Sequence, residues 1–509
     1  MGLGSRILAA AALLAALGSA SVASARSRAP AQRAASSARG RVALSATEPR
    51  ELTSDGDFHM WSPEAGVHKL SVKTKGWETT FETGRIAKLA GGAVLMQAGD
   101  NVLFASACFQ EGGKPADFVP LKVDYQERYS AGGITPGGYI KRDGRPGDTE
   151  ILTSRLIDRP IRPTFPKGWS EETQIISYVL SYDGSSPPDC MAVCASAAAL
   201  SISDVPFASP VACVRVTRSE DGAWKLNAPM EEQAKSDVTL VVAGTASAIL
   251  MIEGFCKFVP EAEIVEACAF GHEAVRDICN AVGAWQEAVG KPKANHLIRV
   301  IPENVAAEVE RMCEGELEKV LSVRSKQQRE AAFEALQAKV ESELTTAVAD
   351  TPAAETGDAP PHSALKSKAQ AAPRAALELA DVQLAFQKLA TKTLRQMVAS
   401  GGPRPDGRKS TEVRPLSMST KVLPRTHGSA LFTRGETQSL ATVTLGDSGS
   451  EQKFEGLTGS GAKRFYLQYS FPPFSVGEVG RFGGAPGRRE RFGGAPGRRE
   501  SHCPDPCNI

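Results

Sequence analysis

The feature that most constrains the fold is a strand–turn–strand pattern that occurs twice in the chain. Residues 429–443 (SALFTRGETQSLATV) align without a gap over residues 93–107 (AVLMQAGDNVLFASA). Each copy has two apolar runs divided by a glycine, Gly99 or Gly435, beside an acidic residue, which is typical of a β-hairpin. Residues 121–133 and 465–478 are also similar, and a glycine-rich loop with a basic pair follows each. We therefore expect two related domains, with a shared groove between them as a natural site.

The first of these domains is expected over residues 65–291, with mixed α and β structure. Alternating residues at 69–72 and 79–82 predict a hairpin, and residues 93–109 predict a second one. Residues 189–200 and 261–288 are predicted helices, and residues 236–252 read as two buried strands.

A helical domain is expected between the two copies, over residues 300–400. Residues 305–344 and 377–398 have helical periodicity, and Gly401, Gly402 and Pro403 end the second helix. Residues 347–374 are rich in Ala, Pro and Thr and are predicted to be a disordered insert. The second copy begins at residue 404 and runs to residue 500, and an unrelated tail follows over residues 501–509.

The N-terminus has the composition of a targeting segment. Residues 1–25 resemble a signal peptide, with an apolar run at 7–17 that is too short to span a bilayer. Residues 26–48 are rich in Arg, Ser and Ala, which is the composition of a transit peptide. This order predicts the plastid stroma through a bipartite leader, with the mitochondrion as the alternative, and no membrane association for the mature protein.

The overall charge limits the kind of nucleic-acid site that the chain can have. The formal net charge is +1, so any such site must be a local patch rather than a general basic field. The 10 cysteines include no Cys-x-x-Cys pair, and no residues are assigned to a metal.

The most basic segment is residues 139–163, YIKRDGRPGDTEILTSRLIDRPIRP. Guanidinium groups bind phosphate through paired, charge-assisted hydrogen bonds, and Tyr139 could stack on a base. The predicted RNA contacts are Tyr139, Lys141, Arg142, Arg145, Arg155, Arg159 and Arg162. For the last three, which share one side of a helix, internal pairing with acids such as Asp158 is the alternative.

Four segments together resemble polynucleotide phosphorylase of the plastid type: residues 137–169, 404–408 (RPDGR), 423–438 and 464–483. The similarity extends from about residue 65 to residue 500, apart from the insert. It implies an α+β fold in which two RNase PH-like domains, the second incomplete here, flank an all-helical domain. It also implies a homotrimer that binds single-stranded RNA 3′ ends.

The resemblance implies a reaction as well. Inorganic phosphate would attack the 3′-terminal phosphodiester and release nucleoside diphosphates, with Mg²⁺ required, and the reverse reaction would polymerise RNA without a template. This activity would serve mRNA decay and RNA 3′-end processing. The family's catalytic arginine pair matches Arg488 and Arg489, and its channel loop matches residues 139–142, where Ile140 replaces one aromatic residue.

The C-terminal end departs from the family pattern. The decapeptide RFGGAPGRRE at 481–490 is repeated at 491–500, and the serine-rich phosphate loop and metal-binding aspartates expected after it are not present. We expect Arg498 and Arg499 to come from a local duplication or an error in the assembled sequence, with a frame change after Glu500, rather than to form a second site. If the sequence is taken literally, the alternative is an RNA-binding or assembly fragment without catalysis.

Overall fold

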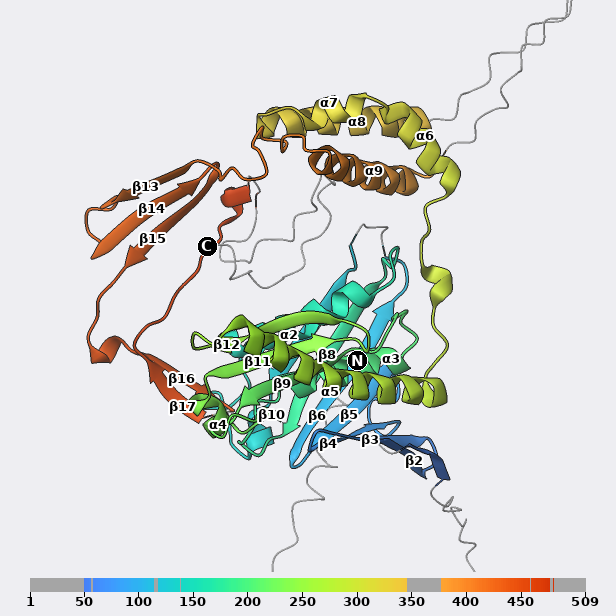
Figure 1. Cartoon of the computed structure of the whole chain (residues 1–509), viewed down its shortest axis with the longest axis vertical. Helices are drawn as coiled ribbons and strands as arrows, with labels where there is room; N and C mark the ends of the chain where they lie inside the picture. Colours follow the sequence, from blue (N-terminus) through green and yellow to red (C-terminus); the bar gives the residue numbers. More distant parts are fainter. Residues whose placement is uncertain are drawn as a thin grey trace, which may run out of the picture. The chain divides into compact units, whose positions relative to one another are not determined.

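The computed structural model describes residues 50–55, 58–113, 118–137, 139–345, 377–457, 459–476 and 479. Several predicted features lie outside these residues: the leader (1–25), the transit segment (26–48), the insert (347–374), the arginine pair (Arg488 and Arg489) and the tail (501–509). Figure 1 shows an α+β part, a group of helices and a group of strands along the chain. Among the described helices, none combines the length and apolar character needed to cross a bilayer.

An eight-stranded sheet forms one layer of the α+β part, in the order β1-β2-β3-β4-β5-β6-β8-β7. The sheet starts before residue 65, where the sequence placed the domain boundary, because β2 pairs with β3. Among the described strands of this sheet, only β7 and β8 run parallel. The strands are β1 (Arg50–Asp55), β2 (Phe58–Glu64), β3 (Val67–Thr74), β4 (Trp77–Thr83), β5 (Gly92–Ala98), β6 (Asn101–Gln110), β7 (Leu121–Glu127) and β8 (Glu172–Ser181).

A second, four-stranded sheet has the order β10-β9-β11-β12. Its strands are β9 (Ala212–Arg218), β10 (Trp224–Leu226), β11 (Val238–Gly244) and β12 (Ile249–Cys256). The sequence predicted both β11 and β12 to be buried. This holds for β11, but β12 is the edge strand and most of its side chains are exposed.

Helices α3 (Asp189–Ile202) and α5 (Glu261–Val289) contact strands of both sheets. Every residue of α3 after Asp189 is buried, and most are Ala, Ser or Cys, so small side chains let the helix lie close to β5, β6 and β9. Helix α2 (Asp148–Ile161) packs on β7. The short elements are α4 (Met230–Lys235), η1 (Tyr129–Gly132), η2 (Arg162–Thr164) and η3 (Asn295–Leu297).

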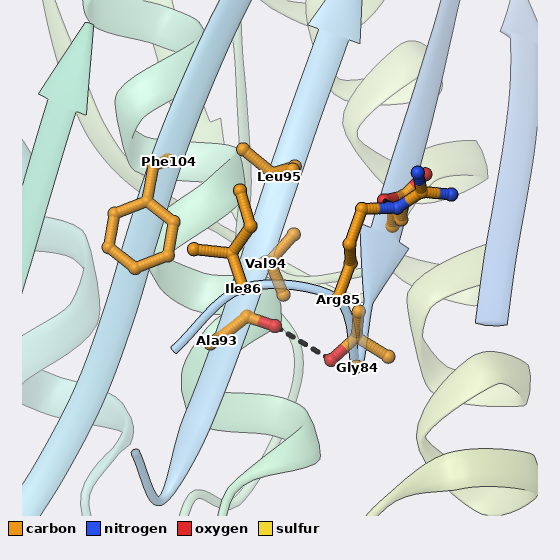
Figure 2. A pocket seen from close by; sticks show the side chains of 9 residues that line it. Gly84, Arg85, Ile86, Ala93, Val94, Leu95 and Phe104 are labelled. Atoms are coloured by element: carbon orange, nitrogen blue, oxygen red, sulfur yellow. Dashed lines mark hydrogen bonds and ion pairs between the residues drawn. The ribbon is translucent and has the colours of Figure 1, made fainter. Parts of the chain in front are cut away.

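The connection from β4 to β5 folds back over the β5–β6 hairpin. Figure 2 shows Ile86 beside Val94, Leu95 and Phe104. Gly84 has φ +91°, and a Cβ there would lie 1.8 Å from the Gly66 carbonyl oxygen, so only glycine fits. Thr83 Oγ1 donates to the Ala93 carbonyl at 2.7 Å. The side chains close the space between them, so this depression offers no ligand site.

Four helices form a separate hydrophobic core, with Phe333 and Phe386 in contact at 5.1 Å between ring centroids. They are α6 (Glu303–Cys313), α7 (Glu316–Leu321), α8 (Lys326–Thr345) and α9 (Leu379–Ala399), and Figure 1 shows them grouped together. The helical stretch predicted over residues 305–344 is three helices. It breaks at Gly315, which has φ +69°, and again after Leu321.

The duplicated hairpin is present in both copies. In the first, β5 and β6 pair through Ala98 and Asn101 around Gly99, which has φ +59°. In the second, β14 (Gly428–Arg434) and β15 (Thr437–Val443) pair through Arg434 and Thr437 around Gly435, which has φ +63°. The turn glycines occupy equivalent positions, as the ungapped alignment predicted.

The described strands of the C-terminal part are largely exposed. They are β13 (Leu416–Thr420), β14 and β15 in one sheet, and β16 (Gln452–Gly456) and β17 (Gly459–Lys463) in a hairpin, with short turns η4 (Ser448–Ser450) and η5 (Pro473–Val476). Residues 465–471 are not a strand, although they match β7. Strand β7 pairs with β8 beside it, whereas the described residues place no strand beside 465–471 for this segment to pair with.

Candidate functional site

The loop that joins η1 to α2, residues 133–147, carries the central part of the predicted RNA site. It follows β7, the strand that runs parallel to β8. Tyr139 is fully exposed, at 102% of its reference area, and Ile140 is 75% exposed. Two large side chains held out in water with no apolar cover are available to a ligand such as an unstacked base.

The base of this loop is held by polar contacts that the sequence reasoning missed. Arg128 Nη1 donates to Asp143 Oδ2 at 2.9 Å, and the Arg128 guanidinium lies 4.6 Å from the Tyr178 ring centroid. The hydrogen bond to Asp143 raises the pKa of Arg128. Glu150 accepts hydrogen bonds from the backbone N–H groups of Glu127 and Gly147, at 2.7 and 2.6 Å. The Gly-x-x-Glu spacing at residues 147–150, where α2 begins, was the one sequence signal that could have indicated the contact between Gly147 and Glu150.

These contacts decide which cations are left for a ligand. Asp143 is adjacent to Arg142 in sequence, but it pairs with Arg128 instead. Within the part of the chain that the structure describes, Lys141, Arg142 and Arg145 are exposed and make no ion pair. Lys141 has φ +52°, a left-handed conformation that is uncommon for a residue other than glycine. Three unpaired cations on one exposed loop are suited to binding phosphate groups.

The three arginines of the α2 region have different surroundings. Arg162 donates to both carboxylate oxygens of Asp158, at 3.0 and 2.5 Å, and to the carbonyls of Val119 and Leu121, at 2.6 and 3.2 Å. Its guanidinium is therefore used to attach α2 to β7, which corresponds to the internal-pairing alternative. Arg159 is exposed and lies 3.3 Å from Glu253. Arg155 is half-buried and interacts within the protein.

A buried polar group lies beneath the ends of β7 and β8. Tyr125 Oη donates to Glu127 Oε1 at 3.1 Å, and burial raises the pKa of the Glu127 carboxyl. Burial also raises the pKa of Tyr182 to about 12. Asp189, at the start of α3, pairs with Arg215. Carboxylates predominate here, which makes the group a poor receptor for phosphate.

Residues 184–187 (GSSP), which lie just before α3, use their hydroxyls within the protein. Ser185 Oγ donates to the Asp183 carboxylate at 2.8 Å, and Ser186 Oγ donates to the Asn227 carbonyl at 3.2 Å. In the C-terminal part, His427 Nδ1 accepts a hydrogen bond from the Leu445 backbone N–H at 2.9 Å, so this ring nitrogen is used within the protein.

The Mg²⁺ implied by the resemblance has no ligand set in the described residues. No three His, Cys, Asp or Glu side chains in the described ranges lie close enough together to hold a metal ion. The carboxylates named above are already bound to arginine, tyrosine, serine or backbone groups. These residues do not fit a metal site.

Three family profiles match the chain in order. The profile of the 3′ exoribonuclease family, domain 1, matches residues 78–206 and again residues 412–500. The profile of that family's domain 2 matches residues 209–274, and the RNA binding domain of polyribonucleotide nucleotidyltransferase matches residues 304–409. The chain belongs to the polyribonucleotide nucleotidyltransferase family. The fold is therefore two RNase PH-like domains with a helical region between them, as predicted.

Bacterial polyribonucleotide nucleotidyltransferases are among the relatives that the chain matches. The polyribonucleotide nucleotidyltransferase of Protochlamydia amoebophila is 44% identical over 422 residues, which is 83% of this chain and 57% of the relative. That of Chlamydia trachomatis serovar D is 46% identical over 410 residues, 81% of this chain and 55% of the relative. The chain thus spans about half the length of the curated relatives it matches.

Proposed function

We propose that this protein is an organellar 3′→5′ exoribonuclease that degrades RNA by phosphorolysis and acts in mRNA decay and RNA 3′-end processing. The single observation that carries the proposal is the ordered match of both exoribonuclease domains and the helical domain to one family. The exposed loop with Lys141, Arg142 and Arg145 unpaired supports an RNA substrate.

The proposed reaction is a transfer of the terminal nucleotide to phosphate. An oxygen of inorganic phosphate attacks the 3′-terminal phosphodiester phosphorus, and the bond from phosphorus to the preceding O3′ breaks. The products are a nucleoside 5′-diphosphate and an RNA shortened by one nucleotide with a free 3′-hydroxyl. Reversal of the same step adds nucleotides from diphosphates without a template.

Two groups of residues are assigned to this reaction. Arg488 and Arg489, which lie outside the described residues, would stabilise negative charge on the phosphate oxygens as the reaction proceeds. The loop would hold the RNA backbone through Lys141, Arg142 and Arg145, with Tyr139 stacked on a base. Of these, Lys141 offers a point charge without the paired hydrogen bonds of arginine.

Phosphate-dependent release of nucleoside diphosphates tests the proposal. The purified 509-residue chain would be incubated with poly(A), Mg²⁺ and labelled inorganic phosphate, and labelled ADP would be measured. We expect ADP from the parent, none from the Arg488→Gln/Arg489→Gln variant, and unchanged release from the Arg498→Gln/Arg499→Gln variant. The second variant is a matched control because its ten-residue sequence context is identical.

The alternative function is an RNA-binding or assembly chain without catalysis. It would be established by a parent that binds poly(A) but releases no ADP under any of these conditions. Equal loss of activity in both arginine-pair variants would instead contradict the assignment of Arg488 and Arg489.

A homotrimer and a plastid location are further parts of the proposal. Sedimentation should give about three times the mass of the 53.8 kDa chain. A fluorescent protein fused after residue 64 should enter the plastid, and a fusion lacking residues 1–25 should not. Entry into the mitochondrion would favour the alternative destination.

A further inference from the structure

Strand β7 lies at the edge of the eight-stranded sheet as the structure describes it, so one side of its backbone faces away from β8. Side chains of α2 bind polar groups on that side. Ser154 Oγ accepts a hydrogen bond from the Tyr125 N–H at 3.1 Å. Glu150 Oε1 accepts one from the Glu127 N–H at 2.7 Å. Alternate residues of a strand direct their N–H groups to the same side, so two side chains one helical turn apart can bind both.

Glu150 also closes the connection between β7 and α2. Its second carboxylate oxygen, Oε2, accepts a hydrogen bond from the Gly147 N–H at 2.6 Å. Glu127 ends the strand and Gly147 precedes the helix, so one carboxylate joins the two ends of the connection. Hydrogen bonds from N–H groups to a carboxylate are charge-assisted and stronger than those between neutral groups. Replacing this one side chain should therefore loosen both ends at once.

Inside the 133–147 loop, polar contacts are few. Among the described residues of 135–146, none forms a backbone hydrogen bond, and one side chain, that of Asp143, pairs with Arg128 at 2.9 Å. Arg128 is held in turn by the Tyr178 ring, whose centroid lies 4.6 Å from the guanidinium. Two carboxylates therefore provide the hydrogen bonds that hold this stretch, Glu150 at its ends and Asp143 within it.

The conformation of the loop includes a backbone geometry that needs support. Lys141 has φ +52°, which is unfavourable for a residue other than glycine. If the two carboxylates did not hold the loop, it would populate other conformations, and Lys141, Arg142 and Arg145 would lose their fixed positions relative to one another. A ligand that binds one conformation has its affinity reduced by the fraction of molecules in that conformation.

We propose that Glu150 and Asp143 are positioning residues for RNA. They hold the 133–147 loop in the conformation in which its three cations bind the RNA backbone, and neither of them touches RNA. The inference rests on the proposed function in one respect, which is that the ligand of this loop is RNA. Both residues are acidic, so their charge alone would weaken the binding of a polyanion.

The sign of the change in affinity separates positioning from simple electrostatics. Glu150→Gln and Asp143→Asn each remove one negative charge near the loop, so electrostatics alone predicts tighter binding of RNA. Positioning predicts weaker binding. Glutamine replaces one acceptor oxygen with an amide NH₂ group that accepts no hydrogen bond, and asparagine loses the charge that strengthens the bond from Arg128.

The 509-residue parent and each variant would be titrated with fluorescent poly(A) at one fixed salt concentration, which requires no activity. Asp148→Asn is the matched control. Asp148 lies in the first turn of α2, is exposed, and has no hydrogen-bond or ion-pair partner among the described residues. We expect Kd to rise about fivefold in Glu150→Gln and about threefold in Asp143→Asn, and to stay equal or fall slightly in the control. Circular dichroism would check that each protein is folded.

A double-mutant cycle tests whether Glu150 acts through the cations of the loop. In a Lys141→Gln/Arg142→Gln/Arg145→Gln background, Glu150→Gln should cause no further loss of affinity, because the loop has no cation left to position. A general structural role would instead give the same loss of about fivefold in both backgrounds.

Several results would overturn the inference. Unchanged or tighter binding of poly(A) by folded Glu150→Gln would do so and leave the proposed function intact, as would an equal loss in the Asp148→Asn control. If Glu150→Gln does not fold, the direction of the change in Asp143→Asn decides. A parent that binds poly(A) more tightly than Glu150→Gln but releases no ADP would contradict the proposed function and leave the inference standing. A parent that binds no poly(A) would contradict both.

Discussion

At the scale of single residues, Arg162 and Arg142 carry the same charge and differ in what surrounds it. Arg162 is bound to Asp158 and to two carbonyls of the neighbouring strand, and its side chain is 18% exposed. Asp143, which follows Arg142 in the sequence, forms its ion pair with Arg128 and not with Arg142. The same residue type is therefore structural at one position and available to a ligand at the other.

Replacing Arg162 with Gln should destabilise the α+β part. The change removes the bidentate pair with Asp158 and two hydrogen bonds to backbone carbonyls, so we expect a loss of about 2–3 kcal/mol in the free energy of unfolding. Urea unfolding followed by tryptophan fluorescence measures this domain, because all five tryptophans lie between residues 61 and 285. Arg145→Gln is the control and should change stability by less than about 0.5 kcal/mol. Weaker RNA binding by folded Arg162→Gln would contradict this structural role.

Lys293 is a second residue whose role is set by its surroundings. Its ammonium donates to the carbonyls of Leu200, Ser201 and Ser203 at the end of α3, at 2.7–2.9 Å. Replacing Lys293 with Met should cost about 1–3 kcal/mol at neutral pH, because three carbonyls lose their donor. Lys291→Met, at an exposed position, is the control.

The pH dependence of Lys293 has a definite sign. Burial lowers its pKa to about 8 from the usual 10.5, so the unfolded chain binds more protons between these values. Stability attributable to this residue should therefore rise with pH from 8 to 10.5. We expect the stability difference between parent and Lys293→Met to widen over that range. A difference that narrows would contradict the lowered pKa.

At the scale of elements, the duplicated hairpin shows how local sequence selects a turn. Gly99 and Gly435 both adopt positive φ between paired strands, at equivalent positions of the two copies. A Cβ on Gly99 would meet nothing within 4 Å, so the need for glycine there comes from the backbone conformation alone.

Gly99→Ala should lower stability by about 1–2 kcal/mol, because a left-handed backbone is unfavourable for alanine. Gly99→Asn should cost less, since asparagine tolerates this region. Tryptophan fluorescence in urea again measures the difference. Equal stability of Gly99→Ala and the parent would mean that the turn relaxes to another type.

At the scale of the whole molecule, the described parts differ in how well they bury apolar surface. The α+β part and the helices each have a hydrophobic core. In the C-terminal part, Met418 is 69% exposed and Leu440 is 55% exposed. A sheet without a buried face is weakly stabilised, because little apolar area leaves water.

Limited proteolysis of the 509-residue chain should therefore remove the C-terminal part first. We expect a protected fragment that ends near Arg404, identified by mass spectrometry. Protection of residues 413–463 under conditions that cleave elsewhere would contradict the exposure described here.

Much of the secondary structure was predictable, because its signals are local. The periodicity at 261–288 and the small residues at 189–200 correspond to α5 and α3. The break at Gly315 was missed because helical periodicity continues on both sides of it. The exposure of β12 was missed because an apolar run does not reveal whether a strand lies at the centre or the edge of a sheet.

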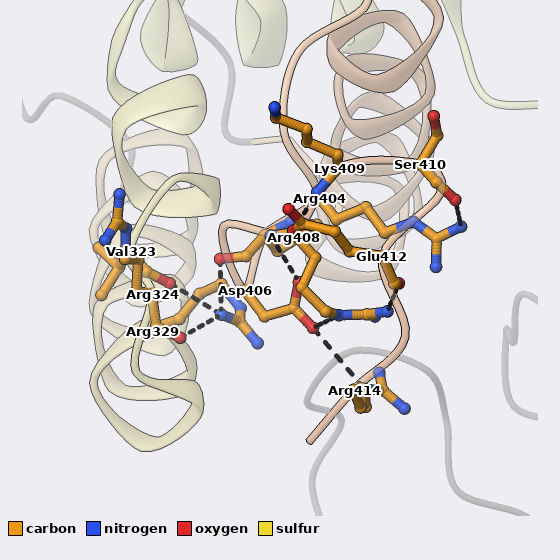
Figure 3. Close-up of polar contacts among 11 residues, drawn as sticks. Val323, Arg324, Arg329, Arg404, Asp406, Arg408, Lys409, Ser410, Glu412 and Arg414 are labelled. Atoms are coloured by element: carbon orange, nitrogen blue, oxygen red, sulfur yellow. Dashed lines mark hydrogen bonds and ion pairs between the residues drawn. The ribbon is translucent and has the colours of Figure 1, made fainter. Parts of the chain in front are cut away.

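The sequence by itself determined the family, the two related domains and the position of the turn glycines, since these depend on residue type and spacing. Only the tertiary structure decided which cations are free. Asp143 forms an ion pair with Arg128, and Asp158 forms one with Arg162. Arg329 donates to carbonyls of two segments that are far apart in the chain (Figure 3). Charge is a property of a residue, but whether that charge can bind RNA depends on the partners that folding brings to it.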